Sequence, residues 1–82
     1  MLKITKFITP TCSQCKTIVP MLEGMVDEGL IEVEELNALE HEELQEKYQF
    51  QSVPTIVFHE ESGDIVRTGV REIMGYISTN VM

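Results

Sequence analysis

Hydrophobic positions along the chain follow the two spacings that distinguish strands from helices. Leu2 to Ile8 is rich in β-branched and apolar residues and stops at Thr9-Pro10-Thr11, which predicts a strand ending in a loop. From Ser13 to about Val26 the apolar residues recur at three- and four-residue steps, typical of one buried helical face: Ile18, Met21, Leu22 and Met25. Pro20 is expected to kink this helix without dividing it, and Gly29 to end it.

The middle of the chain continues with a second strand and a shorter helix. Leu30 to Leu36 alternates well enough for a half-exposed strand. Asn37 and Glu40 then have the spacing of a capping box. A helix is therefore expected over roughly Leu39 to Tyr48.

The last third of the chain combines a hairpin with a final helix. Val53 to Phe58 has high β propensity, and the polar residues 61–64 supply a turn. Asp64 to Thr68 is expected to pair back as the second hairpin strand. Glu72 to about Thr79 has the helical apolar spacing, so it is predicted to form the last helix.

The resulting order, β-α-β-α-β-β-α, predicts a mixed α/β sandwich. The helical crossover between the early strands calls for parallel pairing, and the later strands form an antiparallel hairpin. Nothing divides the chain, so residues 1–82 are expected to form one domain. The core is expected to include the larger apolar side chains Met21, Met25, Tyr48, Phe50, Phe58 and Met74.

Charge and hydropathy exclude several classes of function. The net charge of -8 would repel a phosphate backbone, so no nucleic-acid ligand is expected. The apolar runs are far shorter than the roughly 20 residues that span a bilayer, and the first residues lack the features of a secretory leader. We therefore expect a cytoplasmic monomer without a membrane partner. The acidic surface could aid solubility or attract a basic protein surface.

The only two cysteines, Cys12 and Cys15, are three residues apart at the predicted strand-to-helix junction. In a reducing compartment such a pair is catalytic or metal-binding sooner than structural. The positive end of a helix favours a thiolate on the first cysteine. Cys12 is thus the candidate nucleophile, and Cys15, one turn away, is the candidate resolving thiol.

A zinc site is the alternative, because half of many zinc sites has the same Cys-x-x-Cys spacing. A structural zinc needs four ligands, and the two imidazoles, His41 and His59, lie in separate elements without ligand-like spacing. No metal is therefore expected. Neither histidine is assigned a role.

The run from Phe7 to Lys16 resembles the active-site sequence of glutaredoxins, and Pro20 matches the kinking proline of the thioredoxin active-site helix. Lys47 to Thr55 resembles the thioredoxin stretch that contains a cis-proline facing the disulfide. The chain is thus similar to the thioredoxin-like superfamily over nearly its whole length. The resemblance implies a thioredoxin-like fold and a cis Val53–Pro54 bond.

The same resemblance implies a set of site residues. Besides Cys12 and Cys15, the residues expected to contact or position substrate are Thr11, Ser13, Gln14, Val53, Pro54 and Gly69, and Lys16 is a candidate for electrostatic support of the thiolate. No cofactor is expected beyond a redox-active Cys12–Cys15 disulfide. The implied partners are disulfide-bearing proteins, with a flavoprotein of the thioredoxin-reductase type or a small thiol as reductant.

Some positions depart from the family pattern. The dipeptide between the cysteines is Ser13-Gln14, and this Gln together with residues 68–71 is similar to the small redoxins that serve ribonucleotide reductase. The buried aspartate on the first strand of thioredoxins aligns with Lys6, and no other carboxylate is obvious as a proton acceptor for Cys15. Two functions therefore stay open: a dithiol oxidoreductase, and a non-catalytic acidic module that binds proteins.

Overall fold

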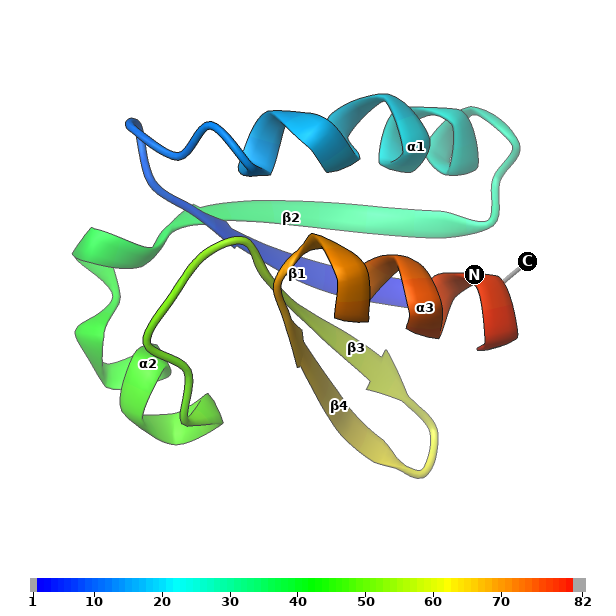
Figure 1. Cartoon of the computed structure of the whole chain (residues 1–82). Helices are drawn as coiled ribbons and strands as arrows, with labels where there is room; N and C mark the ends of the chain where they lie inside the picture. Colours follow the sequence, from blue (N-terminus) through cyan, green and yellow to red (C-terminus); the bar gives the residue numbers. More distant parts are fainter. Residues whose placement is uncertain (1, 81–82) are drawn as a thin grey trace.

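A mixed sheet forms the centre of the protein in the computed structural model, which describes residues 2–80. The sheet has four strands in the order β2-β1-β3-β4 (Figure 1). In chain order the elements are β1 (Leu2–Ile8), α1 (Cys15–Asp27), β2 (Ile31–Asn37), the 3-10 helix η1 (Ala38–Glu40), α2 (Glu42–Tyr48), β3 (Thr55–Glu60), β4 (Gly63–Thr68) and α3 (Val70–Asn80). This order confirms the predicted α/β architecture.

The strand directions follow from the connections between them. β1 and β2 are parallel, as the crossover through α1 requires. β3 runs antiparallel to β1, and β3 and β4 form an antiparallel hairpin. Both predicted pairings are therefore confirmed.

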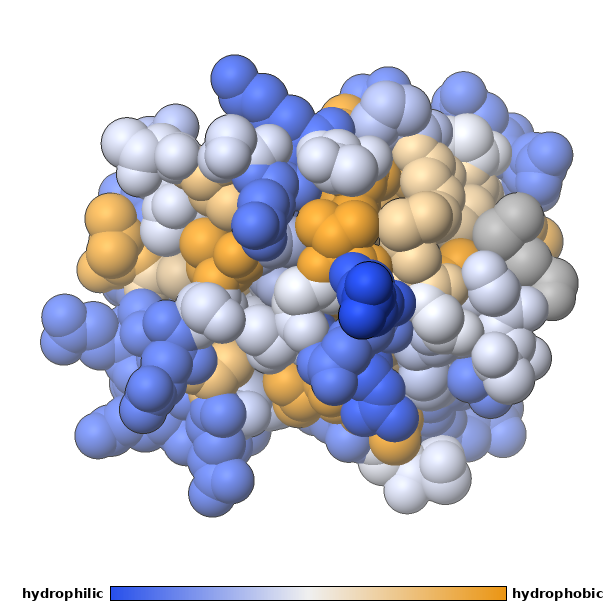
Figure 2. All heavy atoms as spheres, viewed as in Figure 1, coloured by the Kyte–Doolittle hydropathy of each residue, from blue (hydrophilic) through white to orange (hydrophobic). Residues whose placement is uncertain are grey.

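Apolar side chains form a cluster on each face of the sheet. The larger cluster packs beneath α1 and α3 and contains Ile4, Ile18, Leu22, Met25, Ile31, Ile56, Phe58, Ile73 and Ile77. The smaller cluster, on the side of α2, contains Phe7, Ala38, Phe50 and Val57. In Figure 2 hydrophobic atoms are visible between α1 and α3, whereas hydrophilic side chains cover the region of α2. The short α2 covers only part of its face, and the rest of that face is lined by polar side chains.

The helix predicted from Leu39 to Tyr48 is wrong in its first part. His41 has φ -133° and ψ 57°, outside the helical region, so η1 ends before it and α2 begins after it. The side chain of Asn37 accepts a hydrogen bond from the Leu39 N–H at 3.0 Å. Within residues 2–80 no bond from Glu40 completes the predicted capping box.

Several element bounds also differ from the prediction. α1 begins at Cys15 instead of Ser13, and it continues through Pro20 as one helix. β3 begins at Thr55, because Pro54 has no N–H to donate to a strand ladder. Met74 is 44% exposed and is not a core residue, since it lies about 100° around α3 from the buried Ile73.

Candidate active site

The two cysteines lie where β1 leads into α1. After β1 the Cys12 N–H donates to the Thr9 carbonyl at 3.2 Å, which turns the chain before α1 begins at Cys15. Cys12 and Cys15 form a disulfide, with their Cα atoms 5.4 Å apart. The pair therefore occupies the N-terminal end of the helix, as the spacing predicts.

The environments of the two sulfurs differ. Cys15 is only 5% exposed, whereas Cys12 is half-buried and accessible. The Cys15 N–H donates to Cys12 Sγ at 3.1 Å, and the first turn of α1 contains no acidic residue. In the reduced protein this N–H and the helix N-terminus favour negative charge on the outer sulfur. The geometry thus suits Cys12 as the attacking thiolate and Cys15 as its protected partner.

The loop opposite the disulfide is held by a set of hydrogen bonds. The Val53–Pro54 peptide bond is cis, which confirms the prediction from the family resemblance. The buried Thr55 hydroxyl donates to the Ser52 carbonyl at 2.7 Å and lies 3.0 Å from Thr68 Oγ1. The Gly69 N–H donates to the Pro54 carbonyl at 2.8 Å. These bonds fix the loop against the end of β4 and the start of α3.

A shallow hollow surrounds the accessible sulfur. Its lining residues are Thr9, Thr11, Cys12, Ser13, Gln14, Ser52 and Val53. The structure therefore brings Thr11, Ser13, Gln14 and Val53 together around Cys12, and it adds Thr9 and Ser52, which the sequence analysis missed. Both added residues lie within two positions of a predicted one, and this proximity was the available signal. None of these lining side chains carries a charge, so contacts in the hollow come from neutral polar groups.

Besides Cys15, three predicted residues lie outside the lining of this hollow. Pro54 is buried and receives the hydrogen bond from Gly69, whose φ of +91° is in the region that favours glycine. Lys16 is exposed on the first turn of α1. An electrostatic role for Lys16 stays a prediction.

Lys6, which aligns with the buried aspartate of thioredoxins, is itself buried. Its ammonium forms an ion pair with a Glu35 carboxylate oxygen at 3.0 Å, and the two side chains are 8% and 54% exposed. The groove around this pair lies between α1 and β2 and is lined mainly by aliphatic residues and carboxylates. The aligned position is therefore occupied by the cation of an ion pair that joins Lys6 of β1 to Glu35 of β2.

Residues 2–80 contain neither a metal-binding cluster nor a membrane-spanning helix. Over residues 2–80, no group of three or more His, Cys, Asp or Glu side chains is placed to hold a metal ion. The helices in that range are too short or too polar to cross a membrane.

Comparison with known proteins agrees with this geometry. The sequence profile described as Thioredoxin matches residues 2–78. The chain belongs to the thioredoxin family. Family membership and the Cys12–Cys15 disulfide together assign this thioredoxin-family chain a redox function as a thiol–disulfide oxidoreductase.

Solved thioredoxin structures share its fold. It is similar to Deadhead, a germline-specific thioredoxin from Drosophila melanogaster, with a TM-score of 0.77 and 21% identity, over 98% of this chain and 81% of that one. A thioredoxin from Fasciola hepatica gives a TM-score of 0.76 and 24% identity, over 99% of this chain and 81% of that one. A thioredoxin from Nicotiana alata gives a TM-score of 0.75 and 16% identity, over 99% of this chain and 74% of that one. At these identities the structural comparison shows the fold alone.

Proposed function

We propose that this thioredoxin-family protein is a dithiol redoxin that reduces disulfides in protein substrates. The observation that carries the proposal is the asymmetry of the two cysteines. Cys12 is accessible and its sulfur accepts a hydrogen bond from the N-terminus of α1, whereas Cys15 is 5% exposed. Thiol–disulfide exchange needs this arrangement of one reactive and one protected thiol.

The exchange proceeds in two balanced steps. The Cys12 thiolate attacks one sulfur of the substrate disulfide, which forms a mixed disulfide and releases the other substrate sulfur as a thiolate. Cys15 then loses its proton and attacks Cys12 Sγ, which forms the Cys12–Cys15 disulfide and releases the second substrate sulfur. The protein loses two electrons, and the substrate disulfide gains them.

Substrate recognition is assigned to the hollow around Cys12. The backbone of Val53 can pair with an extended segment of the substrate, while Thr11, Ser13 and Gln14 offer neutral hydrogen-bonding groups. Pro54 and Gly69 would keep the Val53 backbone in place through the 2.8 Å bond between them. A neutral lining favours main-chain contacts over selection by charge.

The redoxin is proposed to act as a cytoplasmic monomer with no cofactor beyond its own disulfide. Its reductant would be a flavoprotein of the thioredoxin-reductase type or a low-molecular-weight thiol. A coupled turnover assay that compares thioredoxin reductase with glutathione as electron source distinguishes these two. The source that supports turnover also distinguishes a thioredoxin type from a glutaredoxin type.

A matched pair of variants tests the exchange itself. Cys15→Ser is expected to accumulate a mixed disulfide on Cys12, because the resolving thiol is absent. Cys12→Ser is expected to abolish reduction and to trap no substrate. The readouts are protein-disulfide reduction and intact mass under non-reducing conditions. Full activity in Cys12→Ser would end the proposal.

A second candidate is a non-catalytic acidic module that binds a basic protein. The observation that favours it is a groove on α2 whose lining includes the exposed carboxylates of Glu42, Glu43 and Glu46. Such a module would bind a basic partner equally well with the cysteines oxidised or reduced, and would show no turnover. A dithiol that cycles reversibly near cellular potentials favours the redoxin instead.

A further inference from the structure

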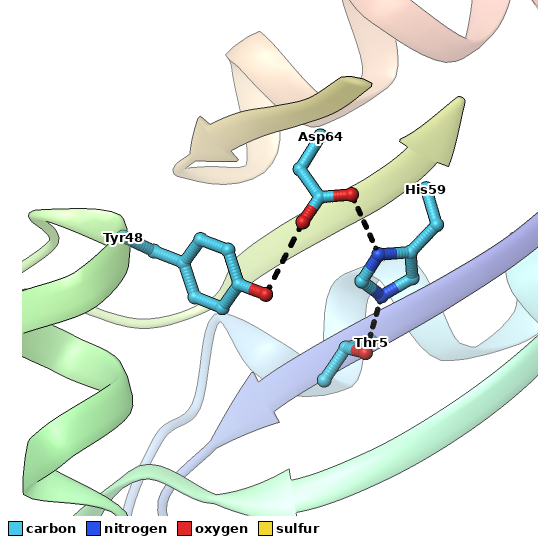
Figure 3. A network of polar contacts seen from close by, with 4 residues as sticks. All are labelled: Thr5, Tyr48, His59 and Asp64. Carbon is cyan, nitrogen blue, oxygen red and sulfur yellow. Dashed lines mark hydrogen bonds and ion pairs between the residues drawn. The ribbon is translucent and has the colours of Figure 1, made fainter. Parts of the chain in front are cut away.

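A second cluster of reactive side chains lies on the part of the sheet that α2 leaves open (Figure 3). Thr5 Oγ1 of β1 is 2.8 Å from His59 Nε2 of β3. His59 Nδ1 is 2.9 Å from Asp64 Oδ1 of β4. The hydroxyl of Tyr48, at the end of α2, donates to Asp64 Oδ2 at 3.3 Å. Four elements thus contribute to one chain of hydrogen bonds.

The direction of each hydrogen bond follows from the chemistry of the groups. The hydrogen bond that His59 Nδ1 donates, together with the one from the Tyr48 hydroxyl, holds the pKa of Asp64 below its ordinary value. Asp64 is therefore ionised at neutral pH and can only accept, so His59 Nδ1 carries the proton and donates to it. In a neutral imidazole Nε2 is then an acceptor. With the imidazole neutral, the Thr5 hydroxyl therefore donates to His59 Nε2.

We infer that Thr5, His59 and Asp64 form a second nucleophilic site, which transfers acyl groups from small esters to the Thr5 hydroxyl. A hydroxyl that donates to an imidazole, which is itself oriented by a carboxylate, is the arrangement that activates an oxygen nucleophile. The two bonds, 2.8 Å and 2.9 Å, have the lengths that proton transfer requires. The thiol chemistry of Cys12 uses none of these three residues.

A substrate can approach the hydroxyl from one side. Thr5 is only 8% exposed, but with Lys3, Glu32, Glu34 and His59 it lines an open groove on the sheet. Lys3 is directly opposite His59 in the strand register, so its ammonium lies on the same face as the reacting groups. This cation can stabilise the oxyanion of a tetrahedral intermediate.

The groove also selects for charge. Glu32 is opposite Lys3 and Glu34 is opposite Thr5 in the register of β1 and β2. These carboxylates repel an acyl group that is itself anionic. The site is therefore assigned to small neutral or cationic esters.

The reaction balances with water as the second reactant. Thr5 Oγ1 attacks the ester carbonyl carbon while His59 Nε2 takes its proton. Collapse of the tetrahedral intermediate breaks the carbon–oxygen bond of the leaving alcohol, which takes that proton from His59. Water, deprotonated by His59, then attacks the acyl-threonine and releases the carboxylic acid and the free Thr5 hydroxyl.

The test measures p-nitrophenyl acetate hydrolysis by the oxidised chain. Its only two cysteines are then joined in the disulfide, so thiol acylation cannot contribute. Thr5→Val removes the hydroxyl while keeping size and β propensity, and it is expected to lower the catalysed rate about 100-fold, as for loss of a base-activated group. Thr5→Ser retains a hydroxyl and is expected to retain activity. Peptide mass mapping is expected to find the acetyl group on Thr5.

A matched control separates this site from ordinary imidazole catalysis. His41 is also partly exposed and lies beside a carboxylate, Glu43, at 3.5 Å, with no hydroxyl hydrogen-bonded to it among residues 2–80. His41→Gln is expected to leave the rate unchanged, whereas His59→Gln is expected to lower it as much as Thr5→Val does. Equal rates in the parent and in Thr5→Val, with the variant folded by circular dichroism, would overturn the inference. Acetyl groups found only on lysines would overturn it as well.

Discussion

Removing one partner at a time from the Lys6–Glu35 ion pair is expected to give unequal losses of stability. The Lys6 side chain is 8% exposed, and it lies in a groove whose lining includes Val19, Leu22 and Val26. The Glu35 side chain is 54% exposed and already meets water. The larger loss of stability is therefore expected when Glu35 is replaced, because the buried Lys6 ammonium then has no partner.

The distance sets the magnitude. Two unit charges at the observed 3.0 Å attract each other by about 5.5 kcal/mol at an effective dielectric constant of about 20. Hydration of the exposed carboxylate cancels most of this attraction. Glu35→Gln leaves a buried ammonium without its partner, so a loss of about 2 kcal/mol is expected. Lys6→Met replaces the ammonium with an apolar chain of similar length, and a loss under about 1 kcal/mol is expected.

Urea denaturation of the oxidised chain measures this difference. With a slope of about 1 kcal/mol/M for a domain of this size, Glu35→Gln should lower the midpoint by about 2 M. Glu34→Gln, the adjacent residue on β2, is the control and should change stability by no more than about 0.5 kcal/mol. A loss in Lys6→Met equal to or larger than that in Glu35→Gln would refute the reasoning.

Two further predictions concern the loop at the active site and the second polar cluster. Gly69→Ala is expected to lower the free energy of unfolding by about 1 kcal/mol, because Gly69 has a φ of +91°. The added Cβ meets open space, so the loss comes from the backbone conformation alone. An unchanged urea midpoint would contradict this prediction. Asp64→Asn removes a carboxylate whose pKa is lowered in the folded protein from its ordinary value of 3.8. The ionised carboxylate therefore stabilises the fold at pH values above 3.8, and this stabilisation disappears as the pH falls through the folded-state pKa. The stability difference between parent and Asp64→Asn should therefore shrink below pH 3.8, and a constant difference in urea titrations across that range would contradict it.

Much of the fold could be predicted because the pattern that specifies it is local. The run of apolar and β-branched residues from Leu2 to Ile8 predicts β1 with its observed bounds, and the apolar spacing predicts the buried face of α1. The break at His41 was missed because the helical spacing of residues 39–48 says nothing of one backbone conformation between them. The cis bond before Pro54 came from the family resemblance, since a proline at the start of a strand is ordinarily trans.

Some residues of the candidate sites could likewise be predicted from local spacing, and others could not. Cys12 and Cys15 are three residues apart, so their proximity and their place at a helix N-terminus could be predicted from spacing. Thr5 and His59 are 54 positions apart, and they meet only because of the register between β1 and β3. The spacing of residues along the chain gives no information about that register. The sequence alone therefore predicts no role for His59.

The most direct measurement of the central claim is the pH dependence of alkylation at each cysteine of the reduced chain. Mass mapping after brief iodoacetamide treatment gives a rate for Cys12 and for Cys15 separately. The Cys15 N–H at 3.1 Å from the Cys12 sulfur predicts that Cys12 reacts with a midpoint clearly below the value of about 8.5 for a free peptide thiol, while Cys15 stays protected at neutral pH. A midpoint for Cys12 at or above that of a free peptide thiol, with both cysteines alkylated at the same rate, would contradict the claim.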